Sequence, residues 1–138
     1  MKHTTLGSRI KAASSTLLAK GKLEKIGEFF APDYAVHYGA ASPARGHTVI
    51  REALGRIKAA FPRLRVKVEI LVASEGRIAW IRTLSGVQRA AYKGFPGEGR
   101  RVVWRELVTS EFRDGLIAEE WIVTDLAEQL LLARKWRK

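Results

Sequence analysis

The side chains best suited to chemistry stand near the end of the sequence, after the pair Asp114-Gly115. This pair lies between two β-prone runs and is typical of a tight hairpin. If no bulge interrupts the strand that follows, one of its faces carries Ile117, Glu119, Trp121, Val123 and Asp125. Burial would raise the pKa of the Asp125 carboxyl group at the end of this row, and a raised pKa suits a general acid or base.

Two other predicted strands carry a charged side chain directly after a tryptophan on the same face. Arg82 follows Trp80 in this way, and Glu106 follows Trp104. If the strand faces meet inside a curved sheet, the three tryptophans would line a cavity that contains Arg82, Glu106 and Asp125. A mostly apolar pocket with a few convergent polar groups is the usual form of a small-molecule site.

Each of these residues also has a purely structural interpretation. Asp125 directly precedes a predicted helix and could be its N-cap. Arg82 and Glu106 could form a structural ion pair. Tryptophans at sheet spacing are often core residues, and His37 could be an exposed loop residue.

Length and composition predict one soluble domain spanning residues 1–138, with a core at about residues 6–133 and a basic tail at 134–138. The 46% of hydrophobic and 28% of charged residues are typical of a globular protein. No run approaches the ~20 apolar residues that span a bilayer. We also see no signal peptide and no cysteine, so we expect a cytoplasmic protein without a membrane partner.

The net charge of +11 raises the question of a polyanionic partner. The 25 lysines and arginines are spread along the chain, without a zinc-finger, RNA-recognition or basic-zipper pattern. We therefore disfavour nucleic-acid binding as the main function. The three histidines at positions 3, 37 and 47 are scattered, and no dinucleotide-type glycine motif follows a strand. We expect no metal and no cofactor.

Hydrophobic periodicity predicts an α+β fold, with helices on one face of a curved antiparallel sheet. The predicted helices are 6–20, 23–30, 47–61 and 126–136, and the predicted extended segments are 33–38, 66–72, 78–86, 101–113 and 117–125. We expect residues 89–100 to form a loop or a wide hairpin connection.

Several motifs, in order and at consistent spacing, resemble the SnoaL-like polyketide cyclase family over residues 23–133. They are Phe29-Phe30-Ala31-Pro32-Asp33-Tyr34 through His37, Gly46 with the helix ending in Ala60-Phe61-Pro62, Leu84-Ser85-Gly86, Gly94-Phe95-Pro96, Gly99-Arg100-Arg101-Val102, and Phe112-Arg113-Asp114-Gly115 to Trp121 and Asp125.

The resemblance implies the cone-shaped α+β barrel of the nuclear transport factor 2-like superfamily, with a strongly curved mixed or antiparallel sheet, and a homodimer. It also implies ring closure by an intramolecular aldol reaction without metal or organic cofactor, with Asp125 as general acid/base. Other superfamily members isomerise or hydrolyse their substrates, or only bind ligands. This sequence departs from the family pattern at three places. Gln88 stands where family members often have the histidine of a G-T-H run, and Ser110 or Glu111 stands where some cyclases have a second histidine. Arg82 stands where the family often has tryptophan.

The resulting hypothesis is an enzyme acting on a hydrophobic, polyketide- or steroid-like substrate. Asp125 would transfer the proton, His37 or Glu106 would orient or share it, and Arg82 would stabilise an oxyanion. The predicted substrate-binding side chains are Trp80, Arg82, Gln88, Trp104 and Trp121. The alternative is a non-catalytic domain of the same fold that binds a small ligand or a protein.

Overall fold

The computed structural model describes residues 2–39 and 42–135, with side chains for 6–39 and 42–133. Its strands form one sheet in the order β2-β1-β6-β5-β4-β3. The strands are β1 Phe30–Tyr38, β2 Ala44–Arg45, β3 Arg65–Ser74, β4 Arg77–Val87, β5 Arg101–Arg113 and β6 Leu116–Thr124. The helices are α1 Lys2–Ala13, the π-helical η1 Ser14–Ala19, the 3₁₀-helical η2 Leu23–Glu28, α2 His47–Ala60 and α3 Leu126–Lys135.

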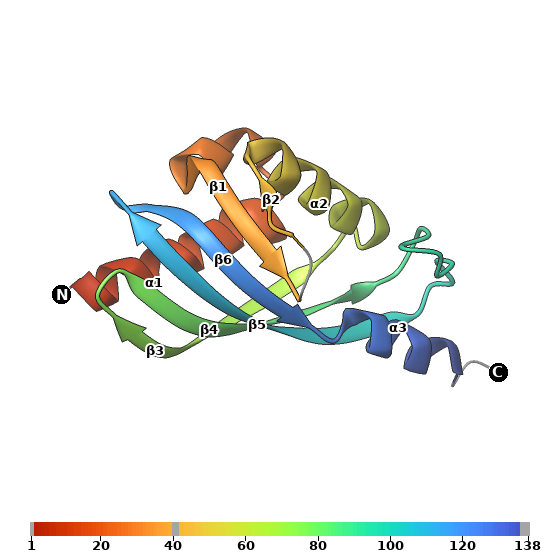
Figure 1. Ribbon diagram of the computed structural model, residues 1–138. Coiled ribbons are helices and arrows are strands. Elements are labelled where there is room, and N and C mark those ends of the chain that lie inside the picture. Colours follow the sequence, from red (N-terminus) through yellow and green to blue (C-terminus); the bar gives the residue numbers. More distant parts are fainter. Residues whose placement is uncertain (1, 40–41, 136–138) are drawn as a thin grey trace.

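Figure 1 shows a strongly curved sheet with α1 and α2 on the same side and α3 leaving the end of β6. The helices bury their apolar faces against the concave side of the sheet. One core cluster joins Ile10 and Leu17 with Ile50 of α2 and Trp80 of β4. A second cluster lies further along the sheet and includes Phe61, Leu64, Leu84, Trp104, Leu126 and Leu130.

The predicted α+β class is confirmed, and the sheet is mixed. Neighbouring strands from β3 to β6 pair antiparallel, whereas β1 pairs in parallel with β6. The sheet is curved but open, with β2 and β3 at its two edges. Strand β2 replaces part of an expected loop, and β1 begins at Phe30 rather than after Pro32. Pro32 fits because it lies where the pairing of β1 with β6 is interrupted.

The predicted hairpin is confirmed, but the expected alternation in β6 is wrong. Asp114 and Gly115 both have positive φ, 55° and 78°, as a two-residue turn of type I′ requires. Phe112 pairs with Ile117, yet Glu111 pairs with Glu119, so Ala118 is an extra residue in β6. This bulge reverses the alternation.

The bulge decides which side chains of β6 reach the concave side. Beyond it, Glu120 and Ile122 are buried at 3% and 4% exposure. Trp121 and Val123 are 38% and 66% exposed and lie on the convex side. Regular alternation would have placed Trp121 and Val123 on the same side as Ile117, but only Ile117, which precedes the bulge, is buried.

None of the helices in the described residues is long and apolar enough to span a membrane. The last predicted helix is confirmed as α3, but its expected final residue, Trp136, lies outside the described residues, as does most of the basic tail.

Two glycine-to-alanine changes, one in this turn and one in α2, should change the free energy of unfolding in opposite directions. Gly115→Ala should lower the free energy of unfolding by about 1 to 2 kcal/mol, because alanine disfavours a positive φ. Gly55→Ala is the control, since Gly55 lies inside α2 with open space around its missing Cβ. It should raise stability by roughly 0.5–1 kcal/mol. Chemical denaturation measures both, and equal effects of the two changes would contradict the assigned turn.

Candidate active site

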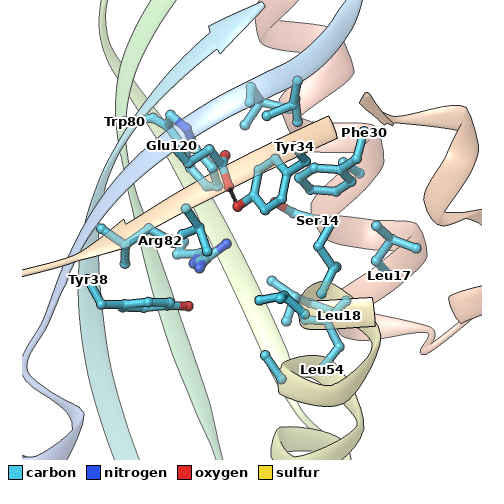
Figure 2. A pocket seen from close by; sticks show the side chains of 18 residues that line it. Ser14, Leu17, Leu18, Phe30, Tyr34, Tyr38, Leu54, Trp80, Arg82 and Glu120 are labelled. Carbon is cyan, nitrogen blue, oxygen red and sulfur yellow. Dashed lines mark hydrogen bonds between the residues drawn. The ribbon is translucent and has the colours of Figure 1, made fainter. Parts of the chain in front are cut away.

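A largely apolar cavity lies between the helices and the concave side of the sheet. Its volume is about 70 Å³, room for several water molecules or part of a small ligand. Apolar side chains from α1, η1 and α2 form one wall, and the sheet forms the other (Figure 2). The polar lining is contributed by Ser14, Tyr34, Tyr38, Arg82 and Glu120.

The carboxyl group of Glu120 is the centre of a buried hydrogen-bond network. The hydroxyl of Tyr34 donates to its Oε1 at 2.7 Å, and the hydroxyl of Ser110 donates to its Oε2 at 2.6 Å. Trp80 Nε1 donates to the Ser110 oxygen at 2.9 Å. β1, β4, β5 and β6 thus each contribute one side chain, and both carboxyl oxygens have a partner.

Burial raises the pKa of Glu120 above the usual glutamate value. The charge of Arg82 and the hydrogen bonds from Ser110 and Tyr34 act in the opposite direction, and they only partly offset the desolvation. Burial also raises the pKa of Tyr34 well above its usual value, with the Glu120 charge as the next cause. Tyr34 therefore stays a hydrogen-bond donor, and burial favours the protonated form of Glu120 relative to an exposed glutamate.

A guanidinium group supplies positive charge to the same cavity. Arg82 Nε donates to Glu106 Oε1 at 2.6 Å, and the two side chains are only 15% and 12% exposed. Burial alone would lower the pKa of Arg82, but the charges of Glu106 and Glu120 outweigh it and raise the pKa. The guanidinium carbon lies 5.4 Å from the centre of the Trp80 ring, which favours the charged form further.

Tyr38 lies at the same polar end of the cavity. The residue is 45% exposed as a whole, yet Figure 2 shows its hydroxyl and the Arg82 guanidinium both pointing into the cavity. Burial of this end raises the pKa of Tyr38, so its hydroxyl remains protonated near neutral pH. The cavity thus offers one carboxyl group, one guanidinium and two phenols.

Three of the predicted site residues lie at the cavity or next to it. Trp80 and Arg82 line it, as expected from the regular alternation of β4. Glu106 lies behind Arg82 and forms the ion pair that was the structural alternative for these two residues. Glu106 therefore positions the guanidinium.

Asp125 is outside the residues that line the cavity. Its Oδ1 accepts the backbone N–H of Arg105 at 2.8 Å, and its Oδ2 accepts the side-chain amide of Gln129 at 3.2 Å. The first N–H of α3, that of Leu126, instead donates to the hydroxyl of Thr124. Asp125 therefore ties the start of α3 to β5, and it is not one of the residues that line the cavity.

His37 and Trp121 lie together on the convex side of the sheet. Their rings stack at 5.0 Å between centres, with 2° between the planes. His37 Nε2 lies 2.6 Å from Glu119 Oε2. The bulge at Ala118 explains this position, because it turns Glu119 and Trp121 away from the cavity.

Gln88 and Trp104 are buried but belong to other parts of the fold. The amide of Gln88 donates to the carbonyls of Ala90 and Phe95 and holds the loop 88–100 together. Trp104 packs against Phe61, with 4.9 Å between ring centres, in the second core cluster. Neither lines the cavity.

In the part of the chain that the structure describes, no group of three or more His, Asp or Glu side chains could hold a metal ion. His47 Nε2 instead lies 3.0 Å and 3.1 Å from the backbone oxygens of Phe30 and Ala31. His47 therefore has a structural role, because it joins α2 to β1.

Sequence reasoning missed the carboxyl group at the centre of the network. The adjacent pair Glu119-Glu120 could have indicated a buried carboxyl group, because one of two neighbouring strand residues faces inward. Strict alternation from the hairpin selected Glu119, and only the bulge selects Glu120. The partnership with Tyr34, 86 residues earlier in the chain, has no local signal at all.

The fold and the cavity define a small α+β domain of the kind expected from the sequence motifs. The sequence profile of the SnoaL-like polyketide cyclase family matches residues 9–131. The chain therefore belongs to this family. No protein of curated function matches it.

Solved structures agree with this assignment at the level of the fold. A proposed SnoaL-like polyketide cyclase from Jannaschia sp. CCS1 superposes with a TM-score of 0.85 at 19% identity, covering 99% of this chain and 95% of the other. IdmH, a proposed polyketide cyclase from Streptomyces antibioticus, gives 0.77 at 24%, covering 94% and 98%. AclR, a proposed hydroxylase from Streptomyces galilaeus, gives 0.79 at 23%, covering 99% and 98%.

The raised pKa of Glu120 predicts a specific pH dependence of stability. The pKa of Glu120 is higher in the folded protein than in the unfolded chain. At pH values between these two pKa values, the folded protein therefore holds a proton on Glu120 that the unfolded chain has lost. The stability from this proton is fully present below the unfolded pKa and is lost as pH rises through the folded pKa. Denaturant unfolding of wild type and Glu120→Gln across this range should therefore show wild type losing stability relative to the variant as pH rises.

Glu69→Gln is the matched control for this experiment, because Glu69 is an exposed glutamate on β3. Its difference from wild type should not follow the same pH profile. A constant difference between wild type and Glu120→Gln at all pH values would contradict the raised pKa.

Proposed function

We propose that the protein is an enzyme that transfers a proton on a hydrophobic, polyketide- or steroid-like substrate, with Glu120 as the general acid/base. The single observation that carries this proposal is the position of Glu120, a carboxyl group with a raised pKa in the wall of an apolar cavity. A general acid/base works best when its pKa lies near the working pH.

The first chemical step is removal of a proton from a carbon next to a substrate carbonyl. The Glu120 carboxylate takes the proton, and the electron pair of the C–H bond moves into the carbonyl, whose oxygen becomes an enolate oxyanion. Arg82 and the hydroxyl of Tyr38 stabilise this negative charge in a largely apolar site. Tyr34 and Ser110 hold the carboxyl group in one orientation throughout.

The second step returns the proton. In an intramolecular aldol ring closure, the enolate carbon attacks a second carbonyl carbon of the same substrate, and the new alkoxide takes the proton from Glu120. In an isomerisation, Glu120 returns the proton to a different carbon. Apolar side chains such as Leu17, Leu54 and Ile122 favour a flat hydrophobic substrate in either reaction.

The proposal predicts that Glu120→Gln lowers activity by about 10²–10⁴-fold, the usual contribution of a general acid/base. Two readouts suit an unidentified substrate: ring closure of aromatic β-keto esters, and exchange of their acidic C–H with deuterium, followed by NMR. The exchange detects proton removal even if no ring forms. Asp125→Asn should leave both rates nearly unchanged, because asparagine keeps the acceptor for the N–H of Arg105.

Loss of activity in Asp125→Asn with retention in Glu120→Gln would reverse the assignment. Binding of these compounds by a wild-type protein that accelerates neither reaction would point to a ligand-binding domain instead.

We also propose that the protein forms a homodimer through the convex side of the sheet. The exposed apolar side chains there include Val103, Leu107, Trp121 and Val123, at 48%, 47%, 38% and 66% exposure. The register of β5 with β6 places Leu107 beside Val123 and Thr109 beside Trp121. Exposed apolar side chains gathered on one side of a sheet favour a self-complementary contact between two copies.

A charge in the middle of this patch should dissociate the dimer. Val123→Glu is expected to elute as a monomer in size-exclusion chromatography with light scattering, because the interface would bury an unpaired carboxylate. Leu131→Glu is the control, since Leu131 is also exposed, at 56%, but lies on α3. A monomeric wild type, or a Val123→Glu variant that remains a dimer, would contradict the interface.

A further inference from the structure

A groove lined by four arginines lies at the end of the sheet where β3 begins, β4 ends and β5 begins. Its volume is about 490 Å³. The lining consists of Pro62, Arg63, Arg65, Ser85, Gly86, Val87, Arg89 and Arg101. The groove shares no lining residue with the cavity around Glu120. Figure 1 shows this end of the molecule, where the loop between β4 and β5 extends beyond the sheet.

Three of the four arginines stand on segments whose backbone is hydrogen-bonded into the fold. Arg65 pairs with Ser85 across β3 and β4, and Arg101 pairs with Val87 across β5 and β4. The N–H of Arg89 donates to the carbonyl of Ala60 at 2.7 Å, which ties the loop to the end of α2. The backbone therefore fixes where these three arginines stand at the groove.

The loop that carries Arg89 is also closely packed. A Cβ on Gly97 would come within 2.4 Å of the backbone nitrogen of Ala90, so only glycine lets these two strands of the loop approach. The two hydrogen bonds from Gln88 close the same loop. Gln88, predicted to bind substrate, thus helps to fix one wall of the groove.

The groove carries an excess of positive charge. No carboxylate lines it, and none of its four arginines takes part in an ion pair within the described residues. Glu98 lines an adjoining hollow with Arg100 and Arg101. Four like charges around one groove repel one another, and a bound anion relieves this repulsion.

We propose that this groove binds phosphate groups, and that its ligand presents at least two of them close together. A guanidinium forms paired hydrogen bonds with phosphate oxygens, and every cation in the lining is an arginine rather than a lysine. A single carboxylate has two oxygens and one charge, so it satisfies one arginine and leaves three. A diphosphate or two neighbouring phosphodiesters carry more oxygens and more negative charge than one carboxylate, so they can bind several of the arginines at once.

The other lining residues indicate how selective the site is. Proline, serine, glycine and valine complete the groove, and no aromatic ring lines it for stacking a base. The groove therefore recognises phosphates and not bases. The phosphates come either from a small phosphorylated molecule or from a nucleic-acid backbone, and the two sources differ in a binding experiment.

The test is calorimetric titration of the full-length protein with inorganic pyrophosphate at low salt. Wild type should bind it, and the double variant Arg65→Gln/Arg101→Gln should bind it at least about tenfold more weakly, because charge-assisted hydrogen bonds to phosphate are lost. The variant Arg65→Lys/Arg101→Lys keeps the charge but lacks the paired geometry, so it should show an intermediate loss.

The matched control is Arg45→Gln/Arg51→Gln, two exposed arginines on β2 and α2. It removes the same charge from the protein and should keep the affinity of wild type. Circular dichroism and thermal unfolding of each variant establish that the fold is intact.

Two further titrations identify the source of the phosphate groups. The first titration uses a short oligonucleotide. If it displaces pyrophosphate, and if the groove variant binds it more weakly whatever its base composition, the phosphates come from a nucleic-acid backbone. Binding of pyrophosphate without the oligonucleotide indicates a small phosphorylated ligand, and both results support the groove.

Three results would overturn the proposal. The first is no pyrophosphate binding by wild type. The second is an equal loss of affinity in the control double variant, because binding would then depend on the net charge of the protein and not on the groove. The third is tighter binding of polyglutamate than of pyrophosphate, which would point to an acidic protein partner.

Discussion

The burial of one carboxyl group is the constraint on which the interior of this protein depends. Glu120 is 3% exposed, and an ionised carboxylate at such a position is costly unless each oxygen has a donor. Tyr34 and Ser110 supply these donors, and Trp80 fixes Ser110. Removing one of them would leave a buried oxygen unpaired, at a cost of about 1–3 kcal/mol. Stability and chemistry therefore depend on the same four side chains.

A single extra residue decides that this group faces the cavity. Without the bulge at Ala118, strict alternation would direct Glu119 and Trp121 inward and Glu120 outward. With it, the convex side gains Trp121, stacked on His37 and paired beside the exposed apolar row of β5. Because of the bulge, β6 places Glu120 in the cavity wall and Trp121 on the convex surface. Bulges near functional sites often re-aim a side chain in this way.

The parts of the structure that follow from local rules could be predicted from the sequence. The Asp114-Gly115 hairpin, the alternation of β4 with Trp80 and Arg82 inside, and the helical periods all depend on neighbouring residues. The bulge could not be predicted, because it depends on how β6 pairs with both β5 and β1. For the same reason Asp125 was selected over Glu120. The arginine groove depends on three distant segments, so the sequence showed only a diffuse excess of positive charge.

Direct titration of the Glu120 carboxyl group tests the central claim most sharply. In protein labelled with ¹³C at the glutamate carboxyl carbon, the signal absent from Glu120→Gln identifies this residue. Its chemical shift, followed against pH, gives its pKa without any assumption about the substrate. A pKa clearly above that of the exposed glutamates is the result expected for a desolvated acid/base in the cavity. A pKa at or below theirs would mean that Glu120 is a permanently ionised structural group, and the proposed chemistry would lose its proton carrier.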